Sequence, residues 1–195
     1  MSAAPVLDTM VETYLADVLD AVEEAGGVVV LAAYPIGSAA TGAFDPETSD
    51  LDVVAVVDKP LGERRGHVVE AIGSLGCPFR ALELVLYVKD SQPPDVELNV
   101  NANSGGAVEK PDEPGFWFVI DAALAQDRAV SFGDAEPWSS YFEQVPEERL
   151  REALVQSITW SEAQPPENAF ARLNATRARH YLETGEWLTK KEVRS

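Results

Sequence analysis

The sequence predicts an α+β fold: a mixed sheet of about four or five strands with helices packed on it, followed by a short α-helical segment. Two observations lead to this prediction. Short apolar runs rich in β-branched residues dominate residues 28–102, and such runs are typical of buried strands. Helical periodicity dominates from residue 116 onward, so strands and helices fall in separate parts of the chain.

Four strands are expected in the first part of the chain. The runs VVVLAAY and LDVVAVVD are apolar and β-branched, which indicates buried strands. The run RALELVLYV alternates, so that Leu82, Leu84 and Leu86 face one side of the strand and Glu83 faces the other. The run VELNVNA is expected at an edge of the sheet. In chain order the expected strands are residues 28–34, 51–58, 80–88 and 96–102.

Helices are expected before, between and after these strands. Apolar residues recur at helical spacing in the first helix, which Gly26-Gly27 ends. The helix beginning at Pro146 has acidic residues in its first turn, and Gly185 ends the last helix. Residues 103–115 (NSGGAVEKPDEPG) have the composition of a loop. In chain order the expected helices are residues 6–25, 62–74, 116–130, 146–160 and about 167–183.

Composition indicates a globular cytoplasmic protein. The 195 residues are 46% hydrophobic, which is enough for a core and excludes a disordered chain. No apolar run reaches the roughly 18 residues of a membrane helix, and no signal peptide is visible. Cys77 is the single cysteine, so no intrachain disulfide is possible and a reduced, cytoplasmic setting fits. We expect a monomer or a homodimer that does not bind membranes.

The charge balance is strongly acidic. There are 33 Asp and Glu residues against 15 Lys and Arg, giving a formal net charge of -18. This argues against nucleic acid as the main partner, because phosphate binding needs a basic face. The charge permits a cationic substrate, which an acidic cleft concentrates. It is also explained by solubility alone, and charge by itself favours that explanation.

Two acidic residues stand at the beginning of the strand 51–58. Asp50 and Asp52 point to the same side of an extended chain, and two ionised carboxylates so close together repel each other. A divalent cation removes that cost, and Mg²⁺ is usually held by one or two carboxylates and substrate phosphates. Glu83 is the one acid in an otherwise apolar strand, and it shares this face if the two strands are neighbours. These three acids are therefore candidate metal ligands and catalytic groups.

The Gly37-Ser38 pair supplies the second half of a candidate site. Glycine lets the backbone come close to a ligand, and a turn entering a short helix presents free N–H groups to phosphate. The Ser38 hydroxyl adds a donor. A turn that binds a triphosphate beside two metal-binding acids is the layout for nucleotidyl transfer. Each part also has a structural explanation: Gly-Ser as an ordinary turn, Asp50 as a turn residue, and Glu83 on a solvated sheet face.

Several stretches resemble a known family. GSAATGAFDPETSDLDVVAVV resembles the Gly-Ser, spacer, Asp-x-Asp signature of the nucleotidyltransferase superfamily related to DNA polymerase β. RALELVLYV, YFEQVPEERLREAL and YLETGEWLTKKEV resemble the aminoglycoside adenylyltransferases that modify streptomycin and spectinomycin. The resemblance implies the polymerase β-like fold and an enzyme that uses Mg²⁺ and ATP. Such an enzyme transfers AMP to a hydroxyl of a small cationic acceptor, which is an antibiotic resistance activity.

The same resemblance implies roles for residues of the strand-rich part. Ser38 and Ser49 would contact the ATP phosphates. Asp50 and Asp52 would hold Mg²⁺. Glu83 would be the general base that deprotonates the acceptor hydroxyl for attack on the α-phosphate, and a role as metal ligand stays open for it.

Further expectations concern the helical part. We expect a nucleotidyltransferase domain over residues 1–140 and a helical domain over residues 141–195. By resemblance, Arg177 and Lys190 of the helical domain would approach the triphosphate. Family members continue with further helices after the TKKE stretch, so the helical domain is expected to be truncated or abbreviated. An aromatic drug contact of the family is replaced near Asn101, which argues against streptomycin as the substrate.

Two other functions remain open from the sequence. Minimal members of the superfamily modify a protein partner, as in toxin–antitoxin pairs, and the sequence allows this acceptor. A non-catalytic nucleotide-binding module is the third alternative, although the full set of acids argues against it.

Overall fold

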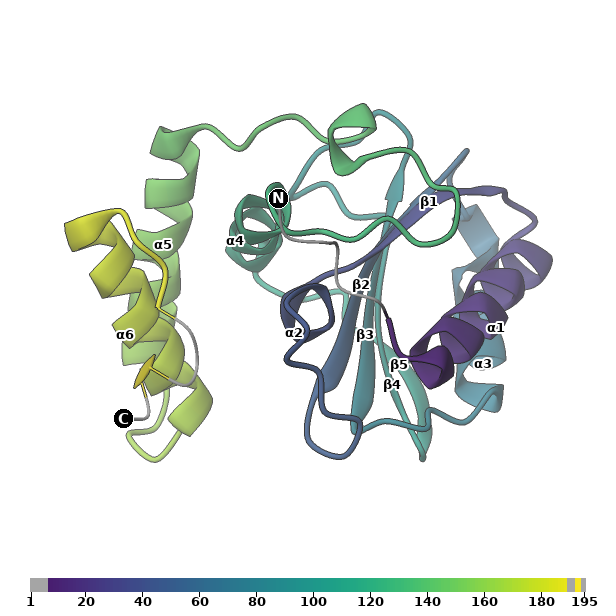
Figure 1. Cartoon of the computed structure of the whole chain (residues 1–195), viewed down its shortest axis with the longest axis horizontal. Coiled ribbons are helices and arrows are strands. Elements are labelled where there is room, and N and C mark those ends of the chain that lie inside the picture. The colour runs from purple at the N-terminus through teal and green to yellow at the C-terminus, as the bar shows by residue number, and fades with distance from the viewer. Residues whose placement is uncertain (1–6, 189–191, 194–195) are drawn as a thin grey trace. The chain divides into compact units, whose positions relative to one another are not determined.

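A five-stranded mixed sheet organises the first part of the computed structural model, which describes residues 7–188 and 192–193 (Figure 1). The β2–β3 pair is parallel, and the other three pairs are antiparallel. The predicted α+β fold with a mixed sheet is therefore confirmed. The strands lie side by side in chain order: β1 (Val30–Pro35), β2 (Asp50–Val57), β3 (Ala81–Val88), β4 (Leu98–Asn103) and β5 (Gly106–Glu109).

The helices begin and end at residues that stabilise helix termini. The Asp8 side chain accepts a hydrogen bond from the Met10 N–H at the start of the first helix, and the Asn168 side chain does the same for Ala171 in the last. Gly185, with φ 75°, ends that last helix as predicted. The helices are α1 (Thr9–Gly26), α2 (Gly37–Ala40), α3 (Arg65–Ser74), α4 (Gly115–Ala125), α5 (Glu147–Glu162) and α6 (Ala169–Thr184), with 3-10 turns η1 (Gly62–Arg64) and η2 (Trp138–Ser140).

Two sequence predictions about the sheet edge are wrong. The predicted loop 103–115 contains β5, so β4 is an inner strand and not an edge strand. Asn103 pairs with Gly106 in a tight hairpin. The strand after this Gly-rich turn has only four residues, so the composition of the segment indicates a loop. Packing compensates for the weak sequence signal, because Ala107 packs against the hydrophobic core.

The helix predicted over residues 116–130 also ends earlier, at Ala125. The polar residues 126–128 follow it, and the chain then returns to the free edge of β1. There the Val130 N–H donates to the Pro35 carbonyl at 3.2 Å, and the Phe132 N–H donates to the Ala33 carbonyl at 2.9 Å. This pairing satisfies backbone groups that a longer helix would have left unpaired on the strand.

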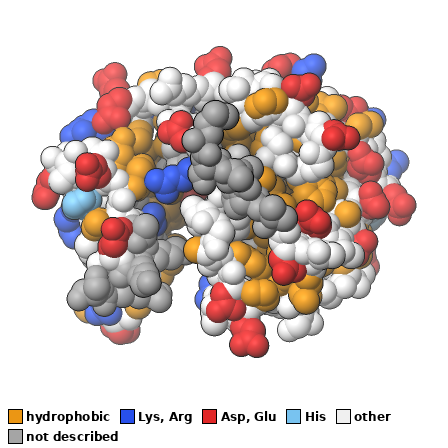
Figure 2. All heavy atoms as spheres, viewed as in Figure 1, with side chains coloured by type: hydrophobic (Ala, Val, Ile, Leu, Met, Phe, Trp, Pro, Cys, Tyr) orange, Lys and Arg blue, Asp and Glu red, His pale blue; other side chains and the backbone are white. Residues whose placement is uncertain are grey.

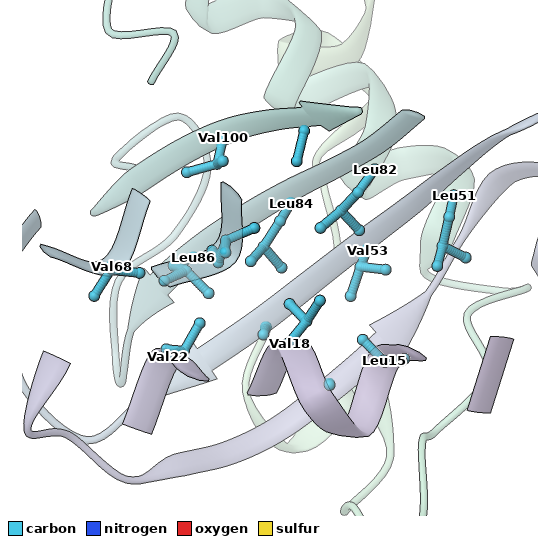
Figure 3. Close-up of a cluster of buried hydrophobic side chains, with 14 of the residues drawn as sticks. Leu15, Val18, Val22, Leu51, Val53, Val68, Leu82, Leu84, Leu86 and Val100 are labelled. Carbon is cyan, nitrogen blue, oxygen red and sulfur yellow. The ribbon is translucent and has the colours of Figure 1, made fainter. Parts of the chain in front are cut away.

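One face of the sheet forms the hydrophobic core with α1 and α3. Figure 3 shows that side chains of the two helices meet those of the inner strands in this layer. Each of these fully buried Leu and Val side chains contributes about 1.5–3 kcal/mol. The labelled residues are Leu15, Val18, Val22, Leu51, Val53, Val68, Leu82, Leu84, Leu86 and Val100.

The opposite face of the sheet is partly covered by aromatic side chains. Trp138 stacks on Phe142 with ring centroids 4.2 Å apart, and both rings contact Tyr34 edge-on. Phe142 also contacts Tyr87 of β3. Trp138 is buried and is therefore a packing residue here. Tyr34 is paired with Val54 and Tyr87 with Val56, so the rings cover this face further along β2 than Asp50 and Asp52.

The chain divides into two compact units. The first comprises Met1–Glu113 and Leu124–Gln144, and the second comprises Pro114–Ala123 and Val145–Ser195. All of α4 except its last two residues thus groups with the helical part of the chain.

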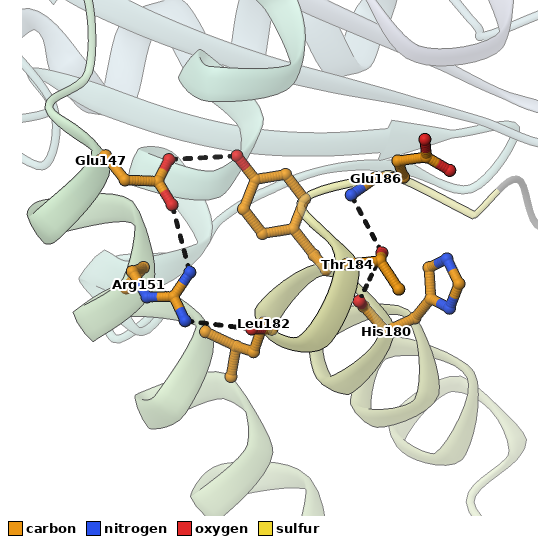
Figure 4. A network of polar contacts seen from close by, with 7 residues as sticks. Glu147, Arg151, His180, Leu182, Thr184 and Glu186 are labelled. Atoms are coloured by element: carbon orange, nitrogen blue, oxygen red, sulfur yellow. Dashed lines mark hydrogen bonds and ion pairs between the residues drawn. The ribbon is translucent and has the colours of Figure 1, made fainter.

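Within the second unit, α5 and α6 pack together and are joined by polar contacts. Arg151 donates to the Glu147 carboxylate at 3.2 Å and to the Leu182 carbonyl at 3.0 Å, and the Tyr181 hydroxyl donates to the same carboxylate (Figure 4). Trp117, Trp160 and Phe170 form an aromatic cluster in this unit.

Candidate active site

The beginning of β2 carries two carboxylates on one face. Asp50 is the first residue of the strand, and the burial pattern alternates over its first four residues. Leu51 and Val53 lie in the core, while Asp50 and Asp52 are half-buried on the opposite face. The strand therefore places both acids together because apolar residues alternate with them.

A polar row continues from Asp52 across the neighbouring strands. Asp52 lies opposite Glu83 in the parallel β2–β3 pair, and Glu83 lies opposite Asn101 in the antiparallel β3–β4 pair. The Asn101 Nδ2 donates to Glu83 Oε1 at 3.5 Å. The predicted neighbourhood of the two acid-bearing strands is thus present, and Glu83 is exposed on the face that carries Asp52.

Arg80 is a member of this site that the sequence reasoning missed. It stands directly before β3, and its Nε donates to Asp50 Oδ1 at 2.7 Å while its Nη2 contacts Asp50 Oδ2. The hydrogen bond and the charge of Asp50 raise the pKa of Arg80, and Glu83 and Asp52 add smaller contributions in the same direction. Arg80 therefore carries a permanent positive charge at the acidic end of the sheet.

The Gly37-Ser38 turn lies against Asp52. The Ile36 N–H donates to the Asp52 carbonyl at 2.9 Å, and α2 begins at the next residue. Gly37 has φ +58°, and a Cβ added there would collide with the Asp52 carboxylate. Only glycine therefore brings the backbone this close to the acid. The predicted turn into a short helix is present at this position.

The two serines of the site differ in their contacts. Ser38 is half-buried in α2, and its carbonyl accepts hydrogen bonds from the N–H groups of Thr41 and Ala43. Ser49 closes the loop before β2, since its Oγ accepts from the Asp45 N–H at 3.1 Å. A hydroxyl that accepts one hydrogen bond still has its own proton to donate, so this contact leaves Ser49 able to act as a donor.

The predicted residues of the helical part belong to the second unit. Arg177 Nε donates to the Leu188 carbonyl at 2.7 Å, and its guanidinium lies 5.9 Å from the ring centroid of Trp187. Lys190 lies outside the described residues.

The carboxylate oxygens of the site are of the kind that binds Mg²⁺, but they are not arranged around a common point. Carboxylate oxygens are the hard ligands that Mg²⁺ prefers, and Asp50, Asp52 and Glu83 supply them from one sheet face. Among the described residues, no group of three or more His, Cys, Asp or Glu is arranged to hold a metal ion. The carboxylate of Asp50 is instead engaged by Arg80.

Comparison with known proteins relates part of the chain to a known domain family. Residues 15–93 match the family model of the nucleotidyltransferase domain. This stretch of the chain is therefore similar to a nucleotidyltransferase domain, and it includes the Gly37-Ser38 turn and the three acids. No curated protein matches the sequence.

A solved structure shares the fold over nearly the whole chain. This is the crystal structure of spectinomycin adenyltransferase AAD(9) from Enterococcus faecialis with ATP and spectinomycin, at 15% identity. The TM-score is 0.72, and the similarity covers 94% of this chain and 79% of that chain. This similarity confirms the predicted polymerase β-like fold, and with the matched family model it supports the resemblance to nucleotidyltransferases. Together with the matched domain, this similarity supports an enzyme.

No helix within the described ranges is long and apolar enough to cross a membrane. On the face drawn in Figure 2, acidic side chains are scattered over the surface of both units and do not gather in one patch.

Proposed function

We propose that the protein transfers AMP from ATP to a hydroxyl of a small cationic acceptor, such as an aminoglycoside or aminocyclitol antibiotic, with Mg²⁺ as cofactor. The observation that carries the proposal is the placement of Asp52 opposite Glu83, directly beside the Gly37-Ser38 turn. This arrangement supports a metal-binding role for Asp52, a proton-accepting role for Glu83 and a phosphate-binding role for the turn, all within the stretch that matches the nucleotidyltransferase domain model.

Asp50 and Asp52 are the proposed ligands of Mg²⁺. When bound, the ion would neutralise charge that develops on the phosphate under attack. Glu83 lies on the next strand and, as a carboxylate on the same face, is either a further ligand or the general base. A Cβ at Gly37 would collide with the Asp52 carboxylate, so a phosphate bound at the turn would lie beside this proposed metal ligand.

The turn and the serines are the proposed phosphate ligands. Gly37 and Ser38 begin α2, which is only four residues long. Because this helix is so short, the energy of phosphate binding must come from local hydrogen bonds to the N–H groups of these residues. The hydroxyls of Ser38 and Ser49 add donors. Arg177 and Lys190 stay predicted ligands of the triphosphate on the strength of the resemblance.

Glu83 is the proposed general base. Its carboxylate would take the proton of the acceptor hydroxyl, whose oxygen then forms a bond to the α-phosphorus of ATP. The bond between that phosphorus and the bridging oxygen breaks, and pyrophosphate leaves. The exposure of Glu83 supports this role, because a small acceptor must reach it from solvent.

The proposed acceptor class rests on charge and on the structural neighbour. The formal net charge of -18 attracts cations, and AAD(9) was solved with ATP and spectinomycin. A small hydroxyl-bearing cation fits both.

The direct test is pyrophosphate release from ATP and Mg²⁺ with a panel of aminoglycosides and aminocyclitols. Wild-type protein should release pyrophosphate with at least one of them, and the acceptor should gain one adenylyl group by mass spectrometry. Asp52→Asn should abolish the release, whereas Asp20→Asn, an exposed acid on α1 at the other face of the sheet, should not. No release with any acceptor, or equal release by Asp52→Asn, would refute the proposal. Labelling of a protein in a cell lysate by labelled ATP would instead favour a protein acceptor.

A further inference from the structure

The Arg80–Asp50 ion pair sits where the proposed metal site would have to form. Both carboxylate oxygens of Asp50 are contacted by the guanidinium, Oδ1 by Nε and Oδ2 by Nη2. This paired geometry is the strongest form of the arginine–carboxylate interaction. The fold brings the two residues together, because the parallel register sets Asp50 opposite Ala81, the residue after Arg80.

The two partners of the pair are unequally exposed. The Arg80 side chain is 61% exposed, whereas that of Asp50 is 18% exposed. The guanidinium therefore approaches from solvent on a long, flexible side chain, and it can leave without disturbing the core. Asp50 cannot leave, since its backbone is fixed in the β2 ladder beside the buried Leu51.

Arg80 also faces the rest of the acidic row. Glu83 and Asp52 contribute to its raised pKa after Asp50, so its charge acts on all three carboxylates. Without a cation these acids would repel one another at the end of a chain that already carries a net charge of -18. A positive charge at this place offsets that repulsion.

We propose that Arg80 is a built-in counter-ion that competes with the divalent metal for Asp50. This inference rests on the proposed function, because it takes Asp50 as a metal ligand. In the metal-free protein Arg80 neutralises Asp50, and a metal ion binds Asp50 only when the guanidinium gives it up. Arg80 is thus a positioning residue that sets the metal affinity of the site, and not a group that touches the reacting atoms.

The competition has a defined sign. Removing the Arg80 charge removes both the competitor for Asp50 and a positive charge that repels the incoming ion. A variant without this charge should therefore bind a divalent ion more tightly in the absence of nucleotide. A purely structural ion pair predicts the opposite, since loss of Arg80 would let Asp50 move out of place and weaken metal binding.

The test is Mn²⁺ binding to the full chain without nucleotide, measured by the loss of the free-ion electron paramagnetic resonance signal. Arg80→Gln should bind Mn²⁺ about 3- to 10-fold more tightly than wild type, the range expected for loss of one nearby ion pair. The matched control is Arg64→Gln. Arg64 lies in η1 beside Gly27, a residue that shortly precedes β1. The start of β1 pairs with the end of β2, whereas Asp50 and Asp52 lie at the beginning of β2. This control should stay within about twofold of wild type, because its charge is far from the acids.

The outcomes separate this inference from the proposed function. Asp50→Asn should lose the Mn²⁺ site. If it binds as wild type does, the proposed metal site itself is wrong. If Asp50→Asn loses the site but Arg80→Gln binds Mn²⁺ equally well or more weakly than wild type, only the counter-ion role of Arg80 is refuted. Equal tightening by Arg64→Gln would also refute it, since the effect would then be one of net charge. Thermal unfolding of each variant without metal verifies that the protein is folded.

Discussion

Asp52 on β2 and Glu83 on β3 lie directly opposite each other in the single parallel strand pair of the sheet. Side chains opposite each other on neighbouring strands share one face, so two carboxylates that are 31 positions apart in the sequence lie side by side in the candidate site. Their unequal surroundings suggest a division of roles. Asp52 is half-buried against the Gly37 turn, whereas Glu83 is exposed and contacts Asn101.

Glu83→Gln tests this division. The substitution keeps size and shape but removes the proton acceptor, so turnover should fall by about 10²- to 10⁴-fold, the effect of losing a general base. Binding of ATP and Mg²⁺, measured by calorimetry, should persist. Glu70→Gln is the matched control, because Glu70 is exposed on α3 at the other face of the sheet. If nucleotide binding disappears together with turnover, Glu83 is a metal ligand and not the base.

Gly37→Ala tests the contact between the turn and Asp52. Alanine at φ +58° is strained, and its Cβ would collide with the Asp52 carboxylate. The backbone strain alone should cost about 1–2 kcal/mol, and the displaced carboxylate should abolish metal-dependent nucleotide binding.

Gly62→Ala is a closely matched control for that prediction. Gly62 has φ +57°, but a Cβ there meets nothing within 4 Å. It should therefore lose a similar amount of stability in urea unfolding while keeping nucleotide binding. Equal nucleotide binding by both variants would show that the close approach at Gly37 has no role in the site.

The shared face of the three acids could be predicted from the sequence because it follows a local rule. Period-two alternation places Asp50 and Asp52 on one face, and a lone acid in an apolar strand marks Glu83. Arg80 and Asn101 follow no local rule. Each joins the site only through strand register, and the parallel register of β2 and β3 depends on packing between segments 30 residues apart.

The edge strand β5 likewise could not be predicted from local sequence rules. The runs that became β1, β2 and β3 are apolar enough to be recognised alone. The four residues of β5 include Gly106 and the exposed Val108, and they form a strand because β4 offers a partner. Pairing between strands decided this element, and no property of the segment itself predicts it.

Ligand binding should stabilise the protein in a metal-dependent way. At about 100 times the dissociation constant, Mg²⁺–ATP should add about 2.7 kcal/mol to the free energy of unfolding. For a chain of this size that corresponds to a rise in melting temperature of about 5–10 °C. Asp52→Asn should lose the part of the rise that depends on Mg²⁺, whereas Asp20→Asn should keep it. A rise that ignores Mg²⁺ would favour a non-catalytic nucleotide-binding module.

The stabilising contribution of Tyr34 should be lost at high pH. Burial raises the pKa of Tyr34 from its ordinary value of 10.0 to about 12, with smaller contributions from Tyr141 and Glu136. Between these two values the unfolded state loses the tyrosine proton first and the folded state keeps it. The stabilising contribution is therefore complete below pH 10 and is lost as pH rises through about 12, with a slope of up to about 1.4 kcal/mol per pH unit.

Tyr34→Phe separates this effect from other alkaline titrations, which both proteins share. The Tyr34 hydroxyl donates to the Glu136 carbonyl at 2.6 Å, so the variant should be about 1 kcal/mol less stable at neutral pH, where the phenol is protonated in both states. That difference should shrink between pH 10 and 12, because only wild type loses the contribution of the buried phenol. Urea unfolding at pH 7, 9, 10 and 11 measures it, and a difference that stays constant across this series would show that the Tyr34 hydroxyl titrates normally in the folded protein.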